Sequence, residues 1–202
     1  MTVRRDPTAS IADSTVFVGT ATVGFCTRVG EPEADEPPVS IGDGVQIGSF
    51  CIVEAGATLA DGVQVDHYCR IARRARVGPR TRILYGGQVF EDVRIGSDCI
   101  IAGELVDRAV VGDCVTFQGN AAHSHADATG DWDEVEEPSP VIKDGSVVGV
   151  GALVIGGVSI GPRSYVAAGE RVTCDVPPET VLKDGRLLPL SHFRGLIKLR
   201  GA

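Results

Sequence analysis

Residues 41–101 read IGDGVQIGSFCIVEAGATLADGVQVDHYCRIARRARVGPRTRILYGGQVFEDVRIGSDCII, and every sixth residue of this segment is aliphatic. These residues are Ile41, Ile47, Val53, Leu59, Val65, Ile71, Val77, Ile83, Val89, Ile95 and Ile101. Because Ile, Leu and Val make up about a quarter of the chain, this run of matches has a chance probability on the order of one in ten million. The residue four positions after each is nearly always small or apolar, and residues two apart share one face of a strand. The segment is therefore a six-residue repeat with two inward positions in each unit.

The same period continues on both sides of this segment. It begins at Ile11, shifts by two residues after Ile101, and returns in a last block that ends at Val172. The further positions are Phe17, Val23, Val29, Leu105, Val111, Phe117, Ile142, Val148, Val154, Ile160 and Val166. Glycine often follows the aliphatic residue, as a tight corner requires. A short straight side that alternates with a corner at a fixed step predicts an all-β fold, a parallel β-helix with side chains filling its axis.

The composition agrees with a solenoid and argues against several other classes. Val and Ile outnumber Leu, Gly reaches 26 residues and aromatic residues make up 5% of the chain, which disfavours a helix bundle and an ordinary β-sandwich. A net charge of -8 argues against nucleic acid or an anionic membrane as a partner. The N-terminus has no apolar signal segment, and no run of about 18 apolar residues occurs, so we expect a soluble, cytoplasmic protein.

Three of the six cysteines occupy the small inward position of the repeat. These are Cys51, Cys69 and Cys99, and we expect them to be small core residues rather than disulfide partners. No two cysteines have the C-x-x-C spacing of a metal site.

Two segments interrupt the repeat and are predicted to be loops. Residues 30–40 are rich in acids and prolines, and residues 119–140 hold the only Trp, two of the four histidines and six acids. We therefore expect a β-helix domain over residues 1–182 that carries these two loops, where function tends to be located. Residues 183–202 form a C-terminal extension, in which Leu187–Arg200 has the mixed apolar and basic pattern of a short amphipathic helix.

The last block of repeats carries motifs of a known family. The segment Val148–Gly161 reads VGVGALVIGGVSIG, and Val166–Pro178 reads VAAGERVTCDVPP. Together with the hexads, these segments resemble the hexapeptide-repeat acyltransferases. The resemblance implies a left-handed turn for the parallel β-helix, a homotrimer, and acetyl-CoA as the acyl donor, with no metal at the site.

Three histidines are candidate general bases. Ala121-Ala122-His123, followed by an acidic loop, looks like the arrangement of the galactoside, maltose and xenobiotic acetyltransferases, in which a loop histidine is the base. An acceptor amine or hydroxyl must lose a proton as it attacks a thioester, and an imidazole, which ordinarily titrates near about pH 6.5, suits that task. His125 either shares this role or is an exposed loop residue. His67, in the segment VDHYC, resembles the base of the bacillosamine-type sugar N-acetyltransferases, and it is otherwise an outward-facing polar residue or a metal ligand.

The resemblance also implies sites for the two substrates. Along the coils, the family's motifs place the acyl donor at Gly151, Ala168, Thr173 and Cys174, with Lys183 and Arg186 near its phosphates. The acceptor is expected to be a small sugar-like molecule, such as an amino sugar or a nucleotide-linked sugar. Its candidate contacts are Asn120, Asp131 and Trp132, since acids around an indole ring suit a cationic group. A solvated acidic loop is the alternative interpretation.

The residues leave other functions open. The arginines Arg70, Arg73, Arg74, Arg76, Arg80 and Arg82 either grip a pyrophosphate or form an exposed face paired with acids. A zinc enzyme similar to the γ-class carbonic anhydrases would use His67, His123 and His125 as metal ligands at a trimer interface. A non-catalytic solenoid that binds a partner through its loops is a third possibility. We expect an acyl-CoA-dependent O- or N-acyltransferase, with His123 as the first choice of base.

Overall fold

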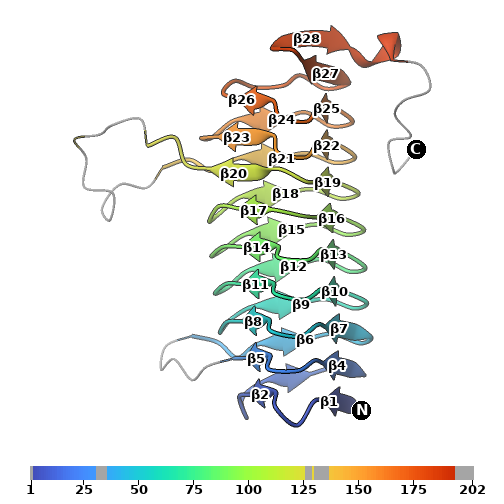
Figure 1. Cartoon of the computed structure of the whole chain (residues 1–202), viewed down its shortest axis with the longest axis vertical. Helices are drawn as coiled ribbons and strands as arrows, with labels where there is room; N and C mark the ends of the chain where they lie inside the picture. The colour runs from blue at the N-terminus through green and yellow to red at the C-terminus, as the bar shows by residue number, and fades with distance from the viewer. Residues whose placement is uncertain (1, 31–35, 126–128, 130–136, 194–202) are drawn as a thin grey trace.

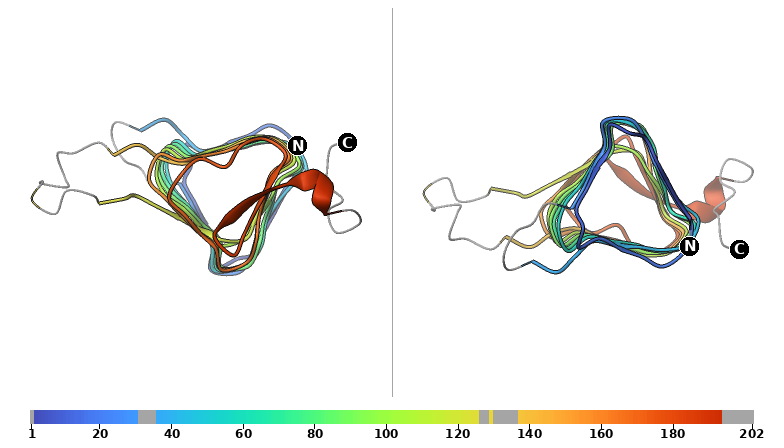
Figure 2. Two further views of the ribbon diagram at one scale, coloured as in Figure 1. Left: turned by 90° about the horizontal axis from the view of Figure 1, so that it is seen from above. Right: turned by 90° about the horizontal axis from the view of Figure 1, so that it is seen from below.

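The computed structural model of the chain describes residues 2–30, 36–125, 129 and 137–193. The chain winds into a solenoid with a triangular cross-section, and each side of the triangle is a sheet of short parallel strands (Figures 1 and 2). One full coil takes 18 residues over most of the solenoid, as the pairing of Gln64 with Arg82 shows. The predicted parallel β-helix is confirmed, and it is left-handed.

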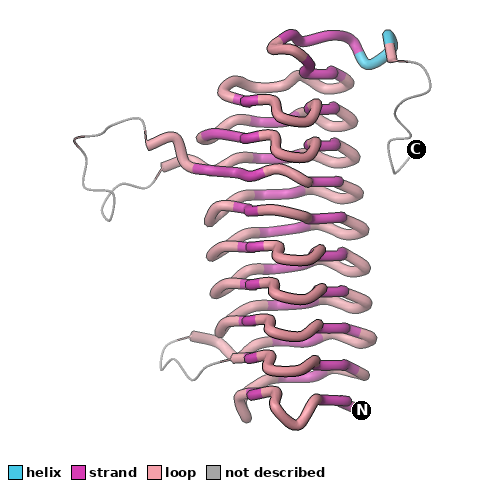
Figure 3. Tube along the Cα trace, viewed as in Figure 1, coloured by secondary structure: helices cyan, strands magenta, loops and turns pink. Residues whose placement is uncertain are grey.

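Each of the three sheets takes one strand from every coil (Figure 3). Sheet A contains β1 (Val3–Arg5), β4 (Ala21–Val23), β7 (Val45–Ile47), β10 (Gln64–Val65), β13 (Arg82–Ile83), β16 (Ile100–Ile101), β19 (Thr116–Phe117), β22 (Val147–Val148), β25 (Tyr165–Val166), β27 (Thr180–Lys183) and β28 (Arg186–Pro189). Sheet B contains β2 (Ser10–Ile11), β5 (Arg28–Val29), β8 (Ile52–Val53), β11 (Arg70–Ile71), β14 (Gln88–Val89), β17 (Glu104–Leu105), β20 (Asn120–Ala122), β23 (Leu153–Ile155) and β26 (Arg171–Val172). Sheet C contains β3 (Val16–Phe17), β6 (Ser40–Ile41), β9 (Thr58–Leu59), β12 (Arg76–Val77), β15 (Arg94–Ile95), β18 (Val110–Val111), β21 (Val141–Ile142) and β24 (Ser159–Ile160).

The aliphatic residue of each hexad points into the axis, as the repeat predicts. Ile41, Leu59, Ile71 and Ile83, for example, are at most 1% exposed. Among the described residues, Phe117 is the only aromatic residue of the buried core. The narrow axis has room for branched aliphatic side chains but seldom for a ring, which explains the composition.

The three cysteines predicted to be core residues are all buried. Cys51, Cys69 and Cys99 are free thiols that line the axis. Beside Cys99, the buried hydroxyl of Thr81 donates to the carbonyl of Gly96 at 2.8 Å and accepts the N–H of Cys99 at 3.1 Å. Even the polar members of the axis are thus paired, since an unpaired buried donor would be destabilising.

The two-residue shift of the repeat after Ile101 shortens one corner of the solenoid. Ala102 and Gly103 alone connect strand β16 to strand β17. Gly103 has a φ of 109°, and a Cβ added there would collide with the carbonyl oxygen of Gly119 in the coil above. Glycine is therefore required at this corner, and Ile100 pairs with Thr116, 16 residues later instead of 18. The next turn from sheet A to sheet B is short as well, because Gln118 and Gly119 alone connect β19 to β20.

The C-terminal end differs from the expected helix over Leu187–Arg200. Arg186–Pro189 is strand β28, which pairs antiparallel with β27, and Leu190–His192 is the single 3-10 turn η1. The reason is local: Asp184 and Gly185 have φ values of 51° and 67°, the conformation of a two-residue hairpin turn that an Asp-Gly pair favours. The remainder of the predicted helix lies outside the described residues. No helix in the described part of the chain is long and apolar enough to span a membrane.

Candidate active site

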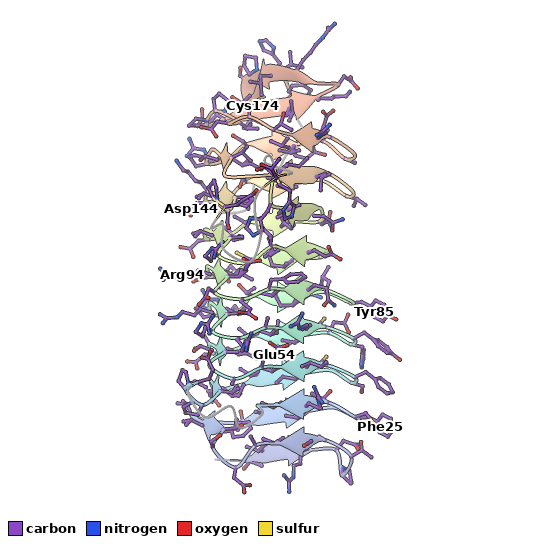
Figure 4. All side chains as sticks on the ribbon, turned by 90° about the vertical axis from the view of Figure 1, so that its left-hand side faces the viewer. Phe25, Glu54, Tyr85, Arg94, Asp144 and Cys174 are labelled. Atoms are coloured by element: carbon purple, nitrogen blue, oxygen red, sulfur yellow. The ribbon has the colours of Figure 1, made fainter. Side chains whose placement is uncertain are left out.

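Both interruptions of the repeat leave the solenoid at one corner, between sheets B and C. The first interruption follows strand β5 and the second follows strand β20, both in sheet B. After each interruption the chain enters sheet C. Figure 4 looks onto this corner, with Glu54 near its middle and Cys174 near its upper end. His123 follows strand β20 directly, so its backbone is anchored by the pairing of β20 with β17 and β23.

His123 is paired with a carboxylate from the coil below. Its Nε2 atom lies 3.2 Å from Oδ2 of Asp107, which is 16 residues earlier and follows strand β17. The side chain of His123 is 13% exposed and that of Asp107 is 35% exposed. The backbone carbonyl of Asp107 also accepts the hydroxyl of Ser139 at 2.6 Å, which fixes the returning end of the long segment beside it.

This contact defines the tautomer of the neutral ring. When Nε2–H of His123 donates to Asp107, the lone pair lies on Nδ1. Nδ1 is shielded from solvent and has no hydrogen-bond partner among the described residues. Such an arrangement can serve general-base chemistry, because a carboxylate holds one nitrogen and the other has a lone pair that can accept a proton.

His125 lies in the same corner. The ring centroids of His123 and His125 are 6.1 Å apart, and the two rings are nearly perpendicular. Glu137 holds this segment, because its carboxylate accepts the backbone N–H of His125 at 2.9 Å and the hydroxyl of Ser124 at 3.0 Å. These hydrogen bonds, the one from the His125 N–H first, hold the pKa of Glu137 below its usual range.

His67 lies at a different corner, between sheets A and B. Its Nδ1 accepts the backbone N–H of Ser49 at 2.8 Å, so in the neutral ring the proton is on Nε2. The corner that carries His67 is three coils below the corner that leads into β20, an axial offset of about 14 Å at the usual strand spacing. The structure therefore brings together His123 and His125 but not His67.

No three metal-ligating side chains meet in the described part of the chain. A trimer of side-by-side solenoids with parallel axes would keep the axial offset between His67 and His123, so it would not join them at one metal ion. The zinc-enzyme alternative therefore has no support from the described geometry.

The residues predicted to bind the acyl donor fall into two groups. Gly151 and Ala168 lie in successive coils at the corner between sheets A and B, and Lys183 and Arg186 of the C-terminal hairpin follow directly above them. The backbone N–H groups of Asp184 and Gly185 donate to Glu170 and fasten the hairpin there.

Thr173 and Cys174 belong to the other group. They follow strand β26 at the corner that carries His123, with strand β23 between β26 and β20. Cys174 is exposed. One sheet-B strand separates the two groups, so a long flexible donor would have to lie across the top of sheet B to touch both.

The predicted acceptor contacts are only partly described. Asn120 is exposed on strand β20, three residues before His123, and its side-chain oxygen accepts the N–H of Glu104 at 3.2 Å. Asp131 and Trp132 lie outside the described residues. Asn120 is thus the one predicted acceptor contact among the described residues.

Most of the arginines that were one candidate for a pyrophosphate-binding site are paired with acids. The pairs are Arg70 with Glu54 at 2.7 Å, Arg73 with Glu91 at 2.7 Å, Arg74 with Asp92 at 2.8 Å and also with Glu36, and Arg80 with Asp98 at 2.6 Å. The hydrogen bond from Arg74 also lowers the pKa of Asp92. Of the two open interpretations, the structure supports the ion-paired face.

Asp107 is the site residue that the sequence interpretation missed. It lies in an ordinary corner segment, Val106-Asp107-Arg108, and its type alone does not distinguish it from the other acids of the chain. A signal was present in a second two-residue shift of the repeat, since the buried Ala121 comes four residues after Phe117 instead of six. A coil of 16 residues places Asp107, and no other acid, directly below His123.

The chain is similar to known proteins over most of its length, although no family model matches it. It is 30% identical over 168 residues to the bifunctional protein GlmU of Shouchella clausii, which covers 76% of this chain and 37% of that protein. It is 27% identical over 192 residues to GlmU of Geotalea daltonii, which covers 87% of this chain and 40% of that protein. The chain thus spans about two fifths of the length of these curated relatives.

Two solved structures share its fold. LpxA of Acinetobacter baumannii matches with a TM-score of 0.54 and 14% identity over 88% of this chain and 69% of that chain. The UDP-N-acetylglucosamine acyltransferase of Francisella novicida matches with a TM-score of 0.51 and 15% identity over 88% of this chain and 65% of that chain. With its six-residue repeat and its left-handed three-sheet solenoid, the chain is similar to the hexapeptide-repeat acyltransferases and shares their fold.

Proposed function

We propose that the protein transfers an acyl group, in the first instance acetyl from acetyl-CoA, to an amino or hydroxyl group of a small sugar-like acceptor. The observation that carries this proposal is the contact of 3.2 Å between Asp107 and His123, which follows strand β20. A histidine with one nitrogen held by a carboxylate and the other unpaired is what proton removal from a nucleophile requires.

In the reaction, Nδ1 of His123 accepts the proton of the acceptor O–H or N–H as that atom attacks the thioester carbonyl. The new C–O or C–N bond forms, the C–S bond breaks, and His123 returns the proton to the departing sulfur, which leaves as the free thiol. Asp107 stabilises the imidazolium between these two transfers. Since Nδ1 is shielded, we expect the neighbouring His125 to move when the acceptor binds.

The residues at the top of the solenoid fit an acyl-CoA. A Cβ added at Gly151 or Gly169 would meet nothing within 4 Å, so the backbone there is open to a ligand. Lys183 and Arg186 supply positive charge directly above for the phosphates. The thioester supplies the activated acyl group, and these residues orient it.

His123 is preferred over the other candidate bases on hydrogen-bond geometry. The unprotonated nitrogen of His67 is already occupied by the N–H of Ser49, so its outward nitrogen is a donor when the ring is neutral. His125 is held by its backbone N–H, which donates to Glu137 at 2.9 Å. The family resemblance supports the further proposals of a homotrimer and of action in the cytoplasm, where acyl-CoA is made and used.

The test is release of the thiol from acetyl-CoA by the purified full chain in the presence of a panel of amino sugars, neutral sugars and nucleotide-linked sugars. We expect thiol release that depends on one class of acceptor, and a product heavier than that acceptor by one acetyl group in mass spectrometry. A non-catalytic binding solenoid would give neither, and the proposal would then fail.

A further inference from the structure

A long groove runs over the lower half of sheet A, away from the corner of His123. It has a volume of about 660 Å³ and crosses strands β1, β4, β7, β10 and β13. Gly24 and Gly48 line it, so its floor is backbone at two successive coils. In Figure 1 these strands form the right-hand side of the lower solenoid.

The outward side chains of these five strands form one polar row in register. The pairings are Arg4 with Thr22, Thr22 with Gln46, Gln46 with Gln64 and Gln64 with Arg82. The row therefore has an arginine at each end, about 19 Å apart at the usual strand spacing, and neutral hydrogen-bonding groups between them.

The arginines of this row differ from those on other parts of the solenoid surface. Arg70, Arg74 and Arg80 are each within 3 Å of a carboxylate oxygen, whereas Arg4 and Arg82 form no ion pair among the described residues. Two acids also line the groove, and both are engaged by neighbouring groups. Asp6 accepts the N–H and the hydroxyl of Thr8, and Asp66 accepts the N–H of His67.

His67 adds an oriented donor to the wall of the groove. Because its Nδ1 accepts the N–H of Ser49, the neutral ring carries its proton on Nε2, and 53% of the side chain is exposed. Asp66 is 3.8 Å from this nitrogen, too far for a direct hydrogen bond. A ligand in the groove would therefore find a neutral N–H at mid-length.

A ladder of four aromatic rings lies at the adjoining corner between sheets A and B. Phe25, Phe50, Tyr68 and Tyr85 come three or four residues after successive members of the polar row, and they are 44% to 66% exposed. Their centroids follow one another at 5.3, 4.9 and 5.4 Å. In Figure 4, Phe25 and Tyr85 project outward along the right-hand edge and mark the two ends of the ladder. The groove thus has an apolar rail beside its polar row.

The upper half of the same sheet is different. There the outward row continues with Ile100, Thr116, Val147 and Tyr165, which are half-buried and mostly apolar. Association with a second copy of the chain would favour this apolar part, because unpaired arginines are poorly suited to a dry interface. The lower half is suited to a hydrated, polar ligand.

We propose that the groove of sheet A binds an elongated acidic oligosaccharide. Such a chain carries carboxylates at intervals for the separated arginines, hydroxyls for the glutamines and His67, and apolar C–H edges for the aromatic rail. A pyrophosphate would need its cations close together, whereas Arg4 and Arg82 stand at opposite ends of the groove. The site is separate from His123, and it stands whether or not the proposed acyl transfer is correct.

The test measures binding of a fluorescently labelled hexamer of galacturonic acid to the full chain, without any acyl donor, by anisotropy. Maltohexaose is the neutral probe of equal length. We expect the acidic hexamer to bind, with affinity that falls as salt rises, and the neutral one to bind at least tenfold more weakly.

The variants locate the site. Arg4→Gln combined with Arg82→Gln should weaken binding of the acidic hexamer at least tenfold, and Arg80→Gln, which removes an ion-paired arginine from another corner, should not. Thermal unfolding checks that each variant folds. Equal loss in both variants, no binding at all, or displacement of the hexamer by equimolar pyrophosphate would overturn the proposal. So would a changed molecular mass of the double variant in light scattering, because the groove would then be a contact between copies.

Discussion

Oδ2 of Asp107 lies 3.2 Å from Nε2 of His123, although the two residues belong to different coils of the solenoid. The contact exists because a second short corner, Gln118-Gly119, reduces this coil to 16 residues, which brings a residue that follows one sheet-B strand beneath the residue that follows the next. The coils of a β-helix stack in fixed register. A corner that is shorter by two residues therefore changes which residues of neighbouring coils lie one above the other. The proposed base and its carboxylate are products of that change.

Replacing Asp107 with Asn should slow catalysis with little effect on folding. The amide keeps the shape of the side chain but cannot stabilise the imidazolium, so we expect kcat to fall on the order of 10²-fold with a much smaller change in KM. Asp113→Asn is the matched control, because the carboxylate of Asp113 accepts a backbone N–H at another corner and an amide oxygen can replace it. Steady-state kinetics of thiol release measures both variants. Equal rates for the two would show that Asp107 does not act through His123.

The short corner Ala102-Gly103, which connects β16 to β17, should tolerate no side chain at Gly103. An added Cβ meets the Gly119 carbonyl, in addition to the cost of about 1–2 kcal/mol for a non-glycine residue at positive φ. Gly103→Ala is expected to lower the free energy of unfolding by more than about 2 kcal/mol. Gly86→Ala has a similar φ penalty but meets nothing within 4 Å, so it should cost about 1 kcal/mol. Urea unfolding followed by circular dichroism compares them, and a similar loss in both would contradict the packing described here.

Cysteine reactivity should follow position in the repeat. Burial raises the pKa of Cys99 to about 11, so its thiol stays protonated at pH 9, where an ordinary exposed thiol of pKa about 8.5 is largely ionised. We expect iodoacetamide at pH 9 to modify Cys26 and Cys174, which are exposed, and to leave Cys99 intact until the protein is unfolded. Mass spectrometry of peptides from native and urea-treated protein gives the order. Early modification of Cys99 in the native protein would contradict its place in the core.

The fold was predictable because the inward positions of a β-helix recur at a constant step. Ile41 through Ile101 share one environment, so their side chains repeat the same chemistry and the pattern is visible without any structure. The inward cysteines were assigned for the same reason. His123 was chosen from its motif and the family resemblance, and its role as the base stays a prediction.

Other features depend on contacts between residues far apart in the chain, and these were not predictable in the same way. Asp107 becomes a partner of His123 only when the coils are stacked with the correct length. The C-terminal residues have a helical pattern in isolation, but the Asp184-Gly185 turn and pairing with β27 favour a hairpin instead. In both cases tertiary context outweighs the local signal.

The most direct test of the account is the rate of acetyl-CoA thiol release by His123→Ala, measured with the acceptor that the wild-type chain uses. His192→Ala is the matched control, because His192 is an exposed histidine of the C-terminal 3-10 turn. The account predicts that His123→Ala loses kcat by at least about 10²-fold while His192→Ala keeps the wild-type rate. A His123→Ala variant that folds and releases thiol at the wild-type rate would contradict it.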